Sequence, residues 1–235
     1  MRVALIAVGD ELLSGDTVNT NAAWLGEQLT QAGATVSRST VIPDDVSEIA
    51  RVVNEYRAAY DAVIVTGGLG PTHDDMTMEA VAAAFGTELA ADPAVEHWLI
   101  EEGGYSAENL APGTTHIPER AELLRNPEGV APGCTIGNVY VLPGVPTEMR
   151  AMFELIADEF GGEKRHREVV RTKEPESKLI DRMQRVQEKF DVKVGSYPGE
   201  HVRLRIQSTD ESAVENAANW LRERVEPPAE TVEED

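Results

Sequence analysis

The 235-residue sequence has little cysteine, little lysine and no long apolar run. Cys134 is the only cysteine, which excludes a disulfide framework within the chain and is typical of a reducing compartment. The apolar run from Val3 to Val8 is too short to span a bilayer and leads directly into Gly9 and Asp10, so we predict neither a membrane span nor a signal peptide. We therefore expect a cytoplasmic protein that does not associate with membranes.

Positive charge is also scarce. The sequence contains 21 basic and 42 acidic residues, a formal net charge of -21, and only five of the basic residues are lysines. Such a balance argues against nucleic acid and anionic membranes as partners. Acid excess with few lysines resembles the proteins of salt-loving microbes, and an ordinary acidic cytosolic protein is the alternative. The halophilic interpretation predicts a fold that salt stabilises by screening repulsion.

One stretch, from Asp61 to Phe85, organises the rest of the sequence. Ala62 to Val65 is apolar and β-branched, which predicts a strand buried on both faces. Gly67, Gly68 and Gly70 follow at once, Pro71 fixes the exit from the turn, and a helical apolar pattern then runs to a terminal glycine at position 86. A strand, a glycine turn and a helix in that order are typical of a phosphate-binding loop, because glycine lets the backbone approach an anion.

Asp74 and Asp75 distinguish this loop from an ordinary nucleotide-binding loop. Two carboxylates beside a phosphate repel it unless a cation lies between them. The alternative is that they only cap the following helix. His73 lies in the same loop and is either a proton shuttle or a solvent-facing turn residue. The other histidines have no metal-ligand spacing, and Ser14 and Cys134 are expected to be structural.

The first half of the chain alternates strands and helices. We predict a strand over 2–8, a turn over 9–15, a helix from Asn21 to Ala32, a strand over 35–42 and a helix capped by Asp45. With the glycine-loop unit this order predicts a mostly parallel sheet with helices on both faces, a three-layer α/β sandwich. Such sheets bind ligands at the carboxyl ends of their strands, where Asp10, Asp44, Gly67–Gly70 and Asp75 all fall.

The second half is less regular. Residues 103–117 are rich in glycine and proline and are predicted to form a flap over the site. Short strands are expected over 123–124, 134–136 and 139–142, the last two joined by a hairpin at Gly137-Asn138, and Thr147 is expected to cap a helix.

Gly161-Gly162 marks the expected domain boundary. Residues 1–162 are predicted to form the α/β sandwich, 163–226 a small β-α-β-β-α subdomain, and 227–235 a disordered acidic tail.

These motifs together resemble the molybdopterin-binding domain family of molybdenum-cofactor biosynthesis, and within it the competence/damage-inducible protein A group. The motifs that carry the resemblance are Val8–Leu13, Asn19–Asn21, Thr66–Asp75, Ala131–Gly133 and Leu142–Pro146. The sequence is also similar to the corresponding domain of FAD synthases. Relatives self-associate, so the resemblance implies a homodimer or homotrimer.

The resemblance also implies a set of site residues. Asp44 and Asp75 would be catalytic, and Asp10, Asp44, Asp74 and Asp75 would hold a divalent metal of the Mg²⁺ type or Co²⁺. The phosphate or ligand would be bound by Gly9, Glu11, Asn21, Thr66, Gly67, Gly68, Leu69, Gly70, Pro71, Thr72, Pro143, Gly144 and Pro146.

Two functions follow from the resemblance. One is metal-dependent cleavage of the pyrophosphate in ADP-ribose or FAD-like molecules; the other is binding or transfer of molybdopterin without hydrolysis. A non-catalytic regulatory module would use the same loop. Position 10 is Asp, where the competence group often has Thr, so the resemblance does not decide which of these substrates the protein takes. Longer members carry a nicotinamide-nucleotide amidase domain that this sequence does not include, so deamidation is not expected.

Overall fold

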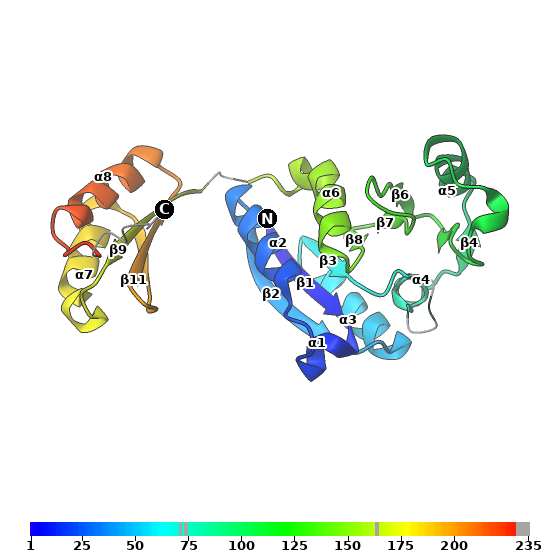
Figure 1. Cartoon of the computed structure of the whole chain (residues 1–235), viewed down its shortest axis with the longest axis horizontal. Helices are drawn as coiled ribbons and strands as arrows, with labels where there is room; N and C mark the ends of the chain where they lie inside the picture. The colour runs from blue at the N-terminus through cyan, green and yellow to red at the C-terminus, as the bar shows by residue number, and fades with distance from the viewer. Residues whose placement is uncertain (71, 73–74, 163–164, 229–235) are drawn as a thin grey trace, which may run out of the picture. The chain divides into compact units, whose positions relative to one another are not determined.

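The computed structural model describes residues 1–70, 72, 75–162 and 165–228 (Figure 1). The chain separates into two compact units, Met1–Gly162 and Glu163–Asp235, and the division follows the glycine pair at 161–162. Within the described residues no helix combines the length and the apolar character needed to cross a membrane.

The first unit is built on a six-stranded sheet with the order β2-β1-β3-β8-β7-β6. Strands β1, β2, β3 and β8 are mutually parallel, whereas β7 and β6 join as antiparallel neighbours. The prediction of a mostly parallel sheet is therefore confirmed. The bounds of the strands are β1 Arg2–Val8, β2 Thr35–Ile42, β3 Ala62–Thr66, β6 Glu122–Leu124, β7 Gly133–Ile136 and β8 Val139–Leu142.

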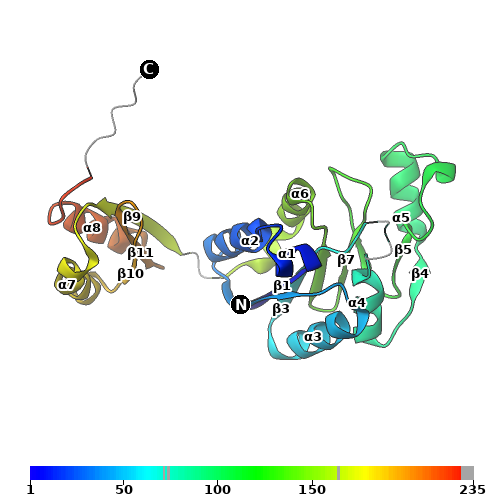
Figure 2. The same cartoon turned by 60° about the horizontal axis from the view of Figure 1, so that its bottom comes forward.

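Helices cover both faces of this sheet (Figure 2). On one face α2 (Thr20–Gln31) and α6 (Pro146–Ile156) pack against the side of β1 that carries Leu5. On the other face α3 (Val46–Ala59) and α4 (Thr77–Phe85) pack against the side that carries Ile6. Because successive strand residues point to opposite faces, β1 and β3 are apolar almost throughout. The predicted three-layer α/β architecture is confirmed.

The other elements of the first unit are short. Strands β4 and β5 pair antiparallel beside α4, and the chain between α5 and β5 is largely irregular, as predicted for the flap. The bounds are α1 Asp10–Ser14, β4 Leu89–Ala91, α5 Pro93–His97, a π-helix Trp98–Glu102, a 3₁₀ turn Ala107–Asn109, β5 His116–Pro118 and a 3₁₀ turn Ala157–Phe160.

Three local predictions were wrong. The segment after β1 is not a plain turn but contains the one-turn helix α1. Helix α2 begins one residue before Asn21, because the Asn19 side chain accepts a hydrogen bond from the Ala22 N–H (3.0 Å) and caps it. Thr147 lies inside α6, which starts at Pro146, since proline suits the first helical position.

The second unit has a three-stranded antiparallel sheet, β10-β11-β9, with α7 and α8 on one face. Its element order is the β-α-β-β-α predicted from the sequence. Residues 229–235, which hold most of the predicted tail, lie outside the described residues. The bounds are β9 His166–Thr172, a 3₁₀ turn Glu176–Lys178, α7 Ile180–Phe190, β10 Lys193–Tyr197, β11 Val202–Ser208 and α8 Glu211–Arg222.

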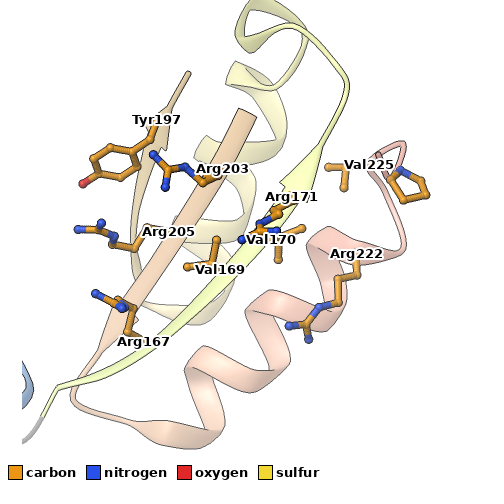
Figure 3. Close-up of a pocket in the computed structure, with 10 residues that line it drawn as sticks. Arg167, Val169, Val170, Arg171, Tyr197, Arg203, Arg205, Arg222 and Val225 are labelled. Carbon is orange, nitrogen blue, oxygen red and sulfur yellow. The ribbon is translucent and has the colours of Figure 1, made fainter. Parts of the chain in front are cut away.

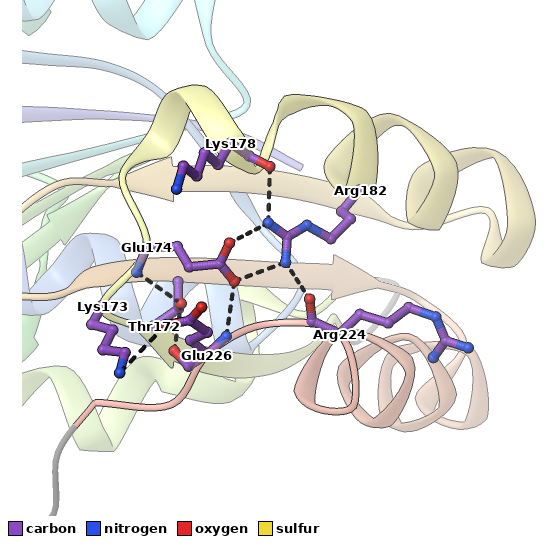
Figure 4. Close-up of polar contacts among 7 residues, drawn as sticks. All are labelled: Thr172, Lys173, Glu174, Lys178, Arg182, Arg224 and Glu226. Atoms are coloured by element: carbon purple, nitrogen blue, oxygen red, sulfur yellow. Dashed lines mark hydrogen bonds and ion pairs between the residues drawn. The ribbon is translucent and has the colours of Figure 1, made fainter.

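A polar cluster ties the ends of these elements together (Figure 4). The Glu174 carboxylate accepts hydrogen bonds from the Arg182 guanidinium and from the Glu226 N–H (2.8 Å). Arg182 also donates to the carbonyl oxygens of Lys178 and Arg224. The Arg182 hydrogen bond, assisted by the Glu226 N–H, lowers the pKa of Glu174 to about 2. The chain after β9 is thereby joined to the start of α7 and the chain after α8.

Candidate functional site

A large cavity of the first unit lies where the parallel strands end. It has a volume of about 860 Å³ and is formed by the segments that follow β1, β2, β3 and β8. Its lining includes every predicted ligand residue that the structure describes, except Thr72. These residues are Gly9, Glu11, Asn21, Thr66, Gly67, Gly68, Leu69, Gly70, Pro143, Gly144 and Pro146.

The glycine loop follows β3 directly. The Gly67 N–H donates to the Leu142 carbonyl (3.1 Å), which continues the sheet into the loop. Gly67 has φ of 101°, and a side chain there would overlap the carbonyl oxygen of Val8. Gly68 has φ of 65°, and a side chain there would overlap the Thr77 hydroxyl at the start of α4. Only glycine therefore allows the backbone to pass this closely between β1 and α4.

Two acids meet on one side of the loop. The Asp44 carboxylate, after β2, accepts a hydrogen bond from the backbone N–H of Asp10, after β1 (2.9 Å). Asp44 is half-buried, and burial raises its pKa above the ordinary aspartate value. The charges of Asp10, Glu11 and Asp75 raise it further, and the hydrogen bond from Asp10 offsets part of the effect. A negative charge at Asp44 is thus costly in the protein alone.

Asp75 lies on the other side of the loop and does not cap α4. Its Oδ2 accepts from the Thr72 N–H (2.9 Å) and the Thr72 hydroxyl (2.6 Å). Helix α4 begins after Met76, which makes no side-chain capping hydrogen bond. The capping interpretation is therefore wrong for Asp75, which closes the exit of the loop instead. Pro71, His73 and Asp74 lie outside the described residues.

Buried polar atoms without partners cluster around the loop. Asn21 donates through Nδ2 to the Gly144 carbonyl (2.7 Å), but its Oδ1 is buried without a hydrogen bond. Thr77 Oγ1, under Gly68, and His116 Nδ1 are likewise buried and unbonded. Asn21 lines this cavity, Thr77 lies directly under Gly68, and His116 lines a neighbouring cavity beside the same loop. Buried polar atoms normally have partners, so these three fit contacts with a ligand or with water.

A second cavity, of about 530 Å³, adjoins the first. Both are lined by Gly68–Gly70, Asp75 and Val130-Ala131, so the glycine loop lies between them. The second cavity also has an apolar and aromatic lining from α4 and from the predicted flap, including Met78, Tyr105 and Leu110, and it holds Thr72. Sequence reasoning predicted its loop residues and a flap from 103–117, but it missed Met78, Glu79, Leu89 and Val130, which share no sequence pattern.

Glu148, from the first turn of α6, was also missed. It lines the first cavity and accepts a hydrogen bond from the Asn126 side chain (2.7 Å). An acid at a helix N-terminus is so common that its sequence position alone indicated nothing.

The predicted metal ligands come together only in part. Asp10, Asp44 and Asp75 line the same cavity, but nowhere in the described residues do three His, Cys, Asp or Glu side chains form a group that could hold a metal ion. Metal binding therefore stays a prediction.

Cys134 and Ser14 stand apart from this chemistry. Cys134 is fully buried in the core, and burial raises the pKa of its thiol to about 12. The Ser14 hydroxyl donates to the Asp16 carboxylate (2.7 Å) within its own turn. Neither residue lines the cavity at the glycine loop.

Comparisons with known proteins cover both units. Residues 4–161 match the family model described as "Probable molybdopterin binding domain", and residues 164–233 match the model "FAD synthase, middle domain". A protein of Archaeoglobus fulgidus is 40% identical over 95% of this chain and 97% of its own length. A CinA-like protein of Frankia casuarinae is 46% identical over 65% of this chain, and the match spans 38% of that protein.

Among solved structures, the protein CinA of Thermoplasma acidophilum, described as of unknown function, is similar to the first part of the chain. The TM-score is 0.62 at 38% identity, over 68% of this chain and 97% of that one. The family model covers well over half of the sequence, and the cavity, the glycine loop and the acids lie within the matched residues. The chain belongs to the molybdopterin-binding domain family, with CinA-like relatives.

Proposed function

We propose that the protein binds a nucleotide or pterin phosphate at the glycine loop and, with a divalent metal, hydrolyses the pyrophosphate of ADP-ribose or FAD-like dinucleotides. The observation that carries this proposal is the charge of the first cavity. Its described lining contains five carboxylates and no lysine, arginine or histidine: Asp10, Glu11, Asp44, Asp75 and Glu148. A phosphate enters such a cavity readily only together with a cation.

The donor set suits a cation that the substrate itself helps to hold. Mg²⁺ is commonly bound by one or two carboxylates together with substrate phosphates and water, so three protein ligands are not required. Asp44 and Asp75 would hold it, with Asp10 beside them, and Co²⁺ could take the same oxygen ligands. When bound, the metal would neutralise the pyrophosphate and lower the pKa of a bound water.

The protein's own groups would bind the ligand and orient the attacking water. Backbone N–H groups of Gly67–Gly70 would donate to phosphate oxygens, as glycine loops at helix starts do. Asn21 Oδ1, buried and without a partner, would accept a hydrogen bond from a hydroxyl of the ligand. Asp44, which lines the cavity beside Asp10, would orient the attacking water through its carboxylate.

The two adjoining cavities support a dinucleotide. A pyrophosphate at the loop would direct one half of the ligand into the acidic cavity of about 860 Å³ and the other into the more apolar cavity of about 530 Å³. Planar rings favour apolar and aromatic walls, which the second cavity offers at Tyr105 and Leu110.

Molybdopterin binding without hydrolysis is the second candidate. The description of the matched family model favours it. It would use the same loop for the pterin phosphate, and it needs no water-activating group.

Incubation with ADP-ribose, FAD or NAD and Mg²⁺ or Co²⁺, followed by chromatography, separates the candidates. Appearance of AMP from ADP-ribose, or of AMP and FMN from FAD, supports hydrolysis. The same reaction with EDTA, and with Asp44→Asn, provides the controls. Inert substrates together with a co-purifying pterin would support molybdopterin binding and refute hydrolysis.

A further inference from the structure

The second unit has an exposed sheet face that the proposed function does not use. Helices α7 and α8 pack on the opposite face, where Leu204 and Ile206 are buried. Because strand side chains alternate, the residues between them point outward. A hollow of about 560 Å³ lies on and beside this outer face (Figure 3).

The outer face is basic. Arg203 on β11 lies opposite Arg171 on β9, and Arg205 follows two positions along β11. Lys193 adds a further charge at an outward position of β10. None of the outward strand positions of this sheet carries Asp or Glu. Like charges directly opposite each other destabilise a sheet, so this arrangement has a cost that a bound anion would remove.

Several other arginines of the unit are paired with acids. Arg182 pairs with Glu174 and Arg185 with Asp181 (3.0 Å), and Arg222, which also lines the hollow, pairs with Glu168 (2.6 Å). By contrast, in the described part of the chain no ion pair involves Arg171, Arg203 or Lys193. The sequence supplies 17 acids in 163–235, so the absence of acids from this face is local.

Charge is also divided unequally between the two units. Residues 1–162 contain 25 acidic and 7 basic residues, whereas residues 163–235 contain 17 and 14. The net charge of -21 therefore describes mainly the first unit. With a screening length of about 8 Å at physiological salt, an anion in the hollow responds chiefly to the guanidinium groups next to it.

The shape and the side chains of the hollow suit phosphate groups. Figure 3 shows the guanidinium groups of Arg203 and Arg205 directed to the same side of the sheet, next to Tyr197. The Arg205 guanidinium lies 4.5 Å from the centre of the Tyr197 ring, which holds it in place while Tyr197 stays 40% exposed. A guanidinium group can donate two parallel hydrogen bonds to two oxygens of one phosphate. The volume of the hollow lies within the usual range for a small-molecule site.

We propose that this outer sheet face binds a small compound with several linked phosphates, such as a nucleoside polyphosphate, independently of the glycine-loop site. The two sites differ in their need for metal. The glycine-loop cavity is lined by carboxylates and requires a cation for phosphate, whereas the outer face supplies its own positive charge.

Calorimetric titration of the full chain with inorganic tripolyphosphate, in EDTA, tests the proposal. We expect the double variant Arg171→Thr, Arg203→Thr to weaken binding at least about tenfold, the loss expected for one charged hydrogen bond. Threonine suits a strand, and removal of the opposed charges should not unfold the unit. The matched control Arg185→Ala, Lys189→Ala removes two exposed charges from α7 and should leave binding unchanged.

A second variant keeps the test valid if the double variant unfolds. Arg203→Lys keeps the charge but removes the paired donors, and it should weaken binding severalfold. Equal losses in the α7 control, or undiminished binding in both the double variant and Arg203→Lys, would refute the proposal.

Two further outcomes would refute the proposal and assign this face to a different partner. If a short single-stranded oligonucleotide displaces tripolyphosphate and binds more than tenfold tighter, the face is a nucleic-acid surface. If light scattering shows self-association that the double variant abolishes without any probe, the face is an interface between copies of this chain.

Discussion

The Asp44 carboxylate accepts a hydrogen bond from the backbone N–H of Asp10 at 2.9 Å, which joins the carboxyl ends of β2 and β1. The bond offsets only part of the effect of burial and of the neighbouring acids, and the pKa of Asp44 is raised. Ionisation of the acid that we propose as catalytic is thus costly to the fold. A bound cation would remove that cost.

The first prediction concerns Asp44→Asn. The folded-state pKa of Asp44 lies above its unfolded value, so the protonated carboxyl stabilises the folded protein relative to the ionised one. This stabilisation is fully present below the unfolded pKa and is lost as pH rises through the folded pKa. The variant, which still accepts from Asp10, should therefore melt above the parent chain at pH 7, and the gain should shrink towards pH 4. Its hydrolysis rate should fall by a factor on the order of 10². Thermal melts from pH 4 to 8 check the first expectation, and a constant difference would contradict it.

The second prediction concerns Asp75→Asn. The amide oxygen still accepts from Thr72, so the melting temperature should change little. Loss of the charge should weaken the dependence on metal and reduce turnover by a factor on the order of 10². Thr72→Val, which removes the hydroxyl donor and keeps the carboxylate, is the control and should retain metal dependence. Full activity in Asp75→Asn would remove Asp75 from the catalytic assignment.

The third prediction concerns the thiol of Cys134. A fully buried thiol with its pKa raised to about 12 should not react with a disulfide reagent at pH 8 in the native protein, and it should react at once in urea. Leu155→Cys places a thiol at an exposed position of α6 and provides the positive control. Rapid native reaction of Cys134 would show that the core around β7 opens.

The fourth prediction concerns Glu174→Gln. The folded-state pKa of Glu174, about 2, lies below its usual value, so its stabilisation is present above pH 4.5 and is lost as pH falls towards 2. At pH 7 the variant should destabilise the second unit by about 2 kcal/mol, the contribution of a charged hydrogen bond. Hydrogen exchange of peptides from α7 and α8 measures this unit alone. A difference between the two chains that persists at pH 2 would contradict the assignment.

The fifth prediction concerns salt. With a net charge of -21 concentrated in residues 1–162, repulsion should destabilise the fold in dilute buffer. The halophilic interpretation predicts that the melting temperature continues to rise into molar salt. Screening alone, with a length of about 10 Å already at 0.1 M, would not account for that rise. Thermal melts from dilute buffer to molar salt test this interpretation, and a melting temperature that does not change with salt would refute it.

The sequence alone determined the fold class and the main strands and helices. Apolar β-branched runs, glycine stops and capping residues act between neighbours in the chain, so β1, β2, β3 and the order of the second unit could be predicted. The start of α2 was misplaced by one residue and the cap of α6 by two, because the competing signals, Asn19 and Pro146, are equally local. The convergence of Asp10, Asp44 and the glycine loop could also be predicted, since parallel strands bring their carboxyl ends to one edge.

Only the tertiary structure decided which groups contact each other. That Asp75 binds Thr72, that Asn21 Oδ1 is left without a partner, and that the flap forms a second cavity all depend on packing between distant segments. The basic outer face is the clearest case. Its arginines are spread through an acidic sequence, and only the pairing of β9 with β11 brings Arg171 opposite Arg203. Sequence spacing encodes which residues share a strand, whereas strand pairing and side-chain alternation decide which charges share a face.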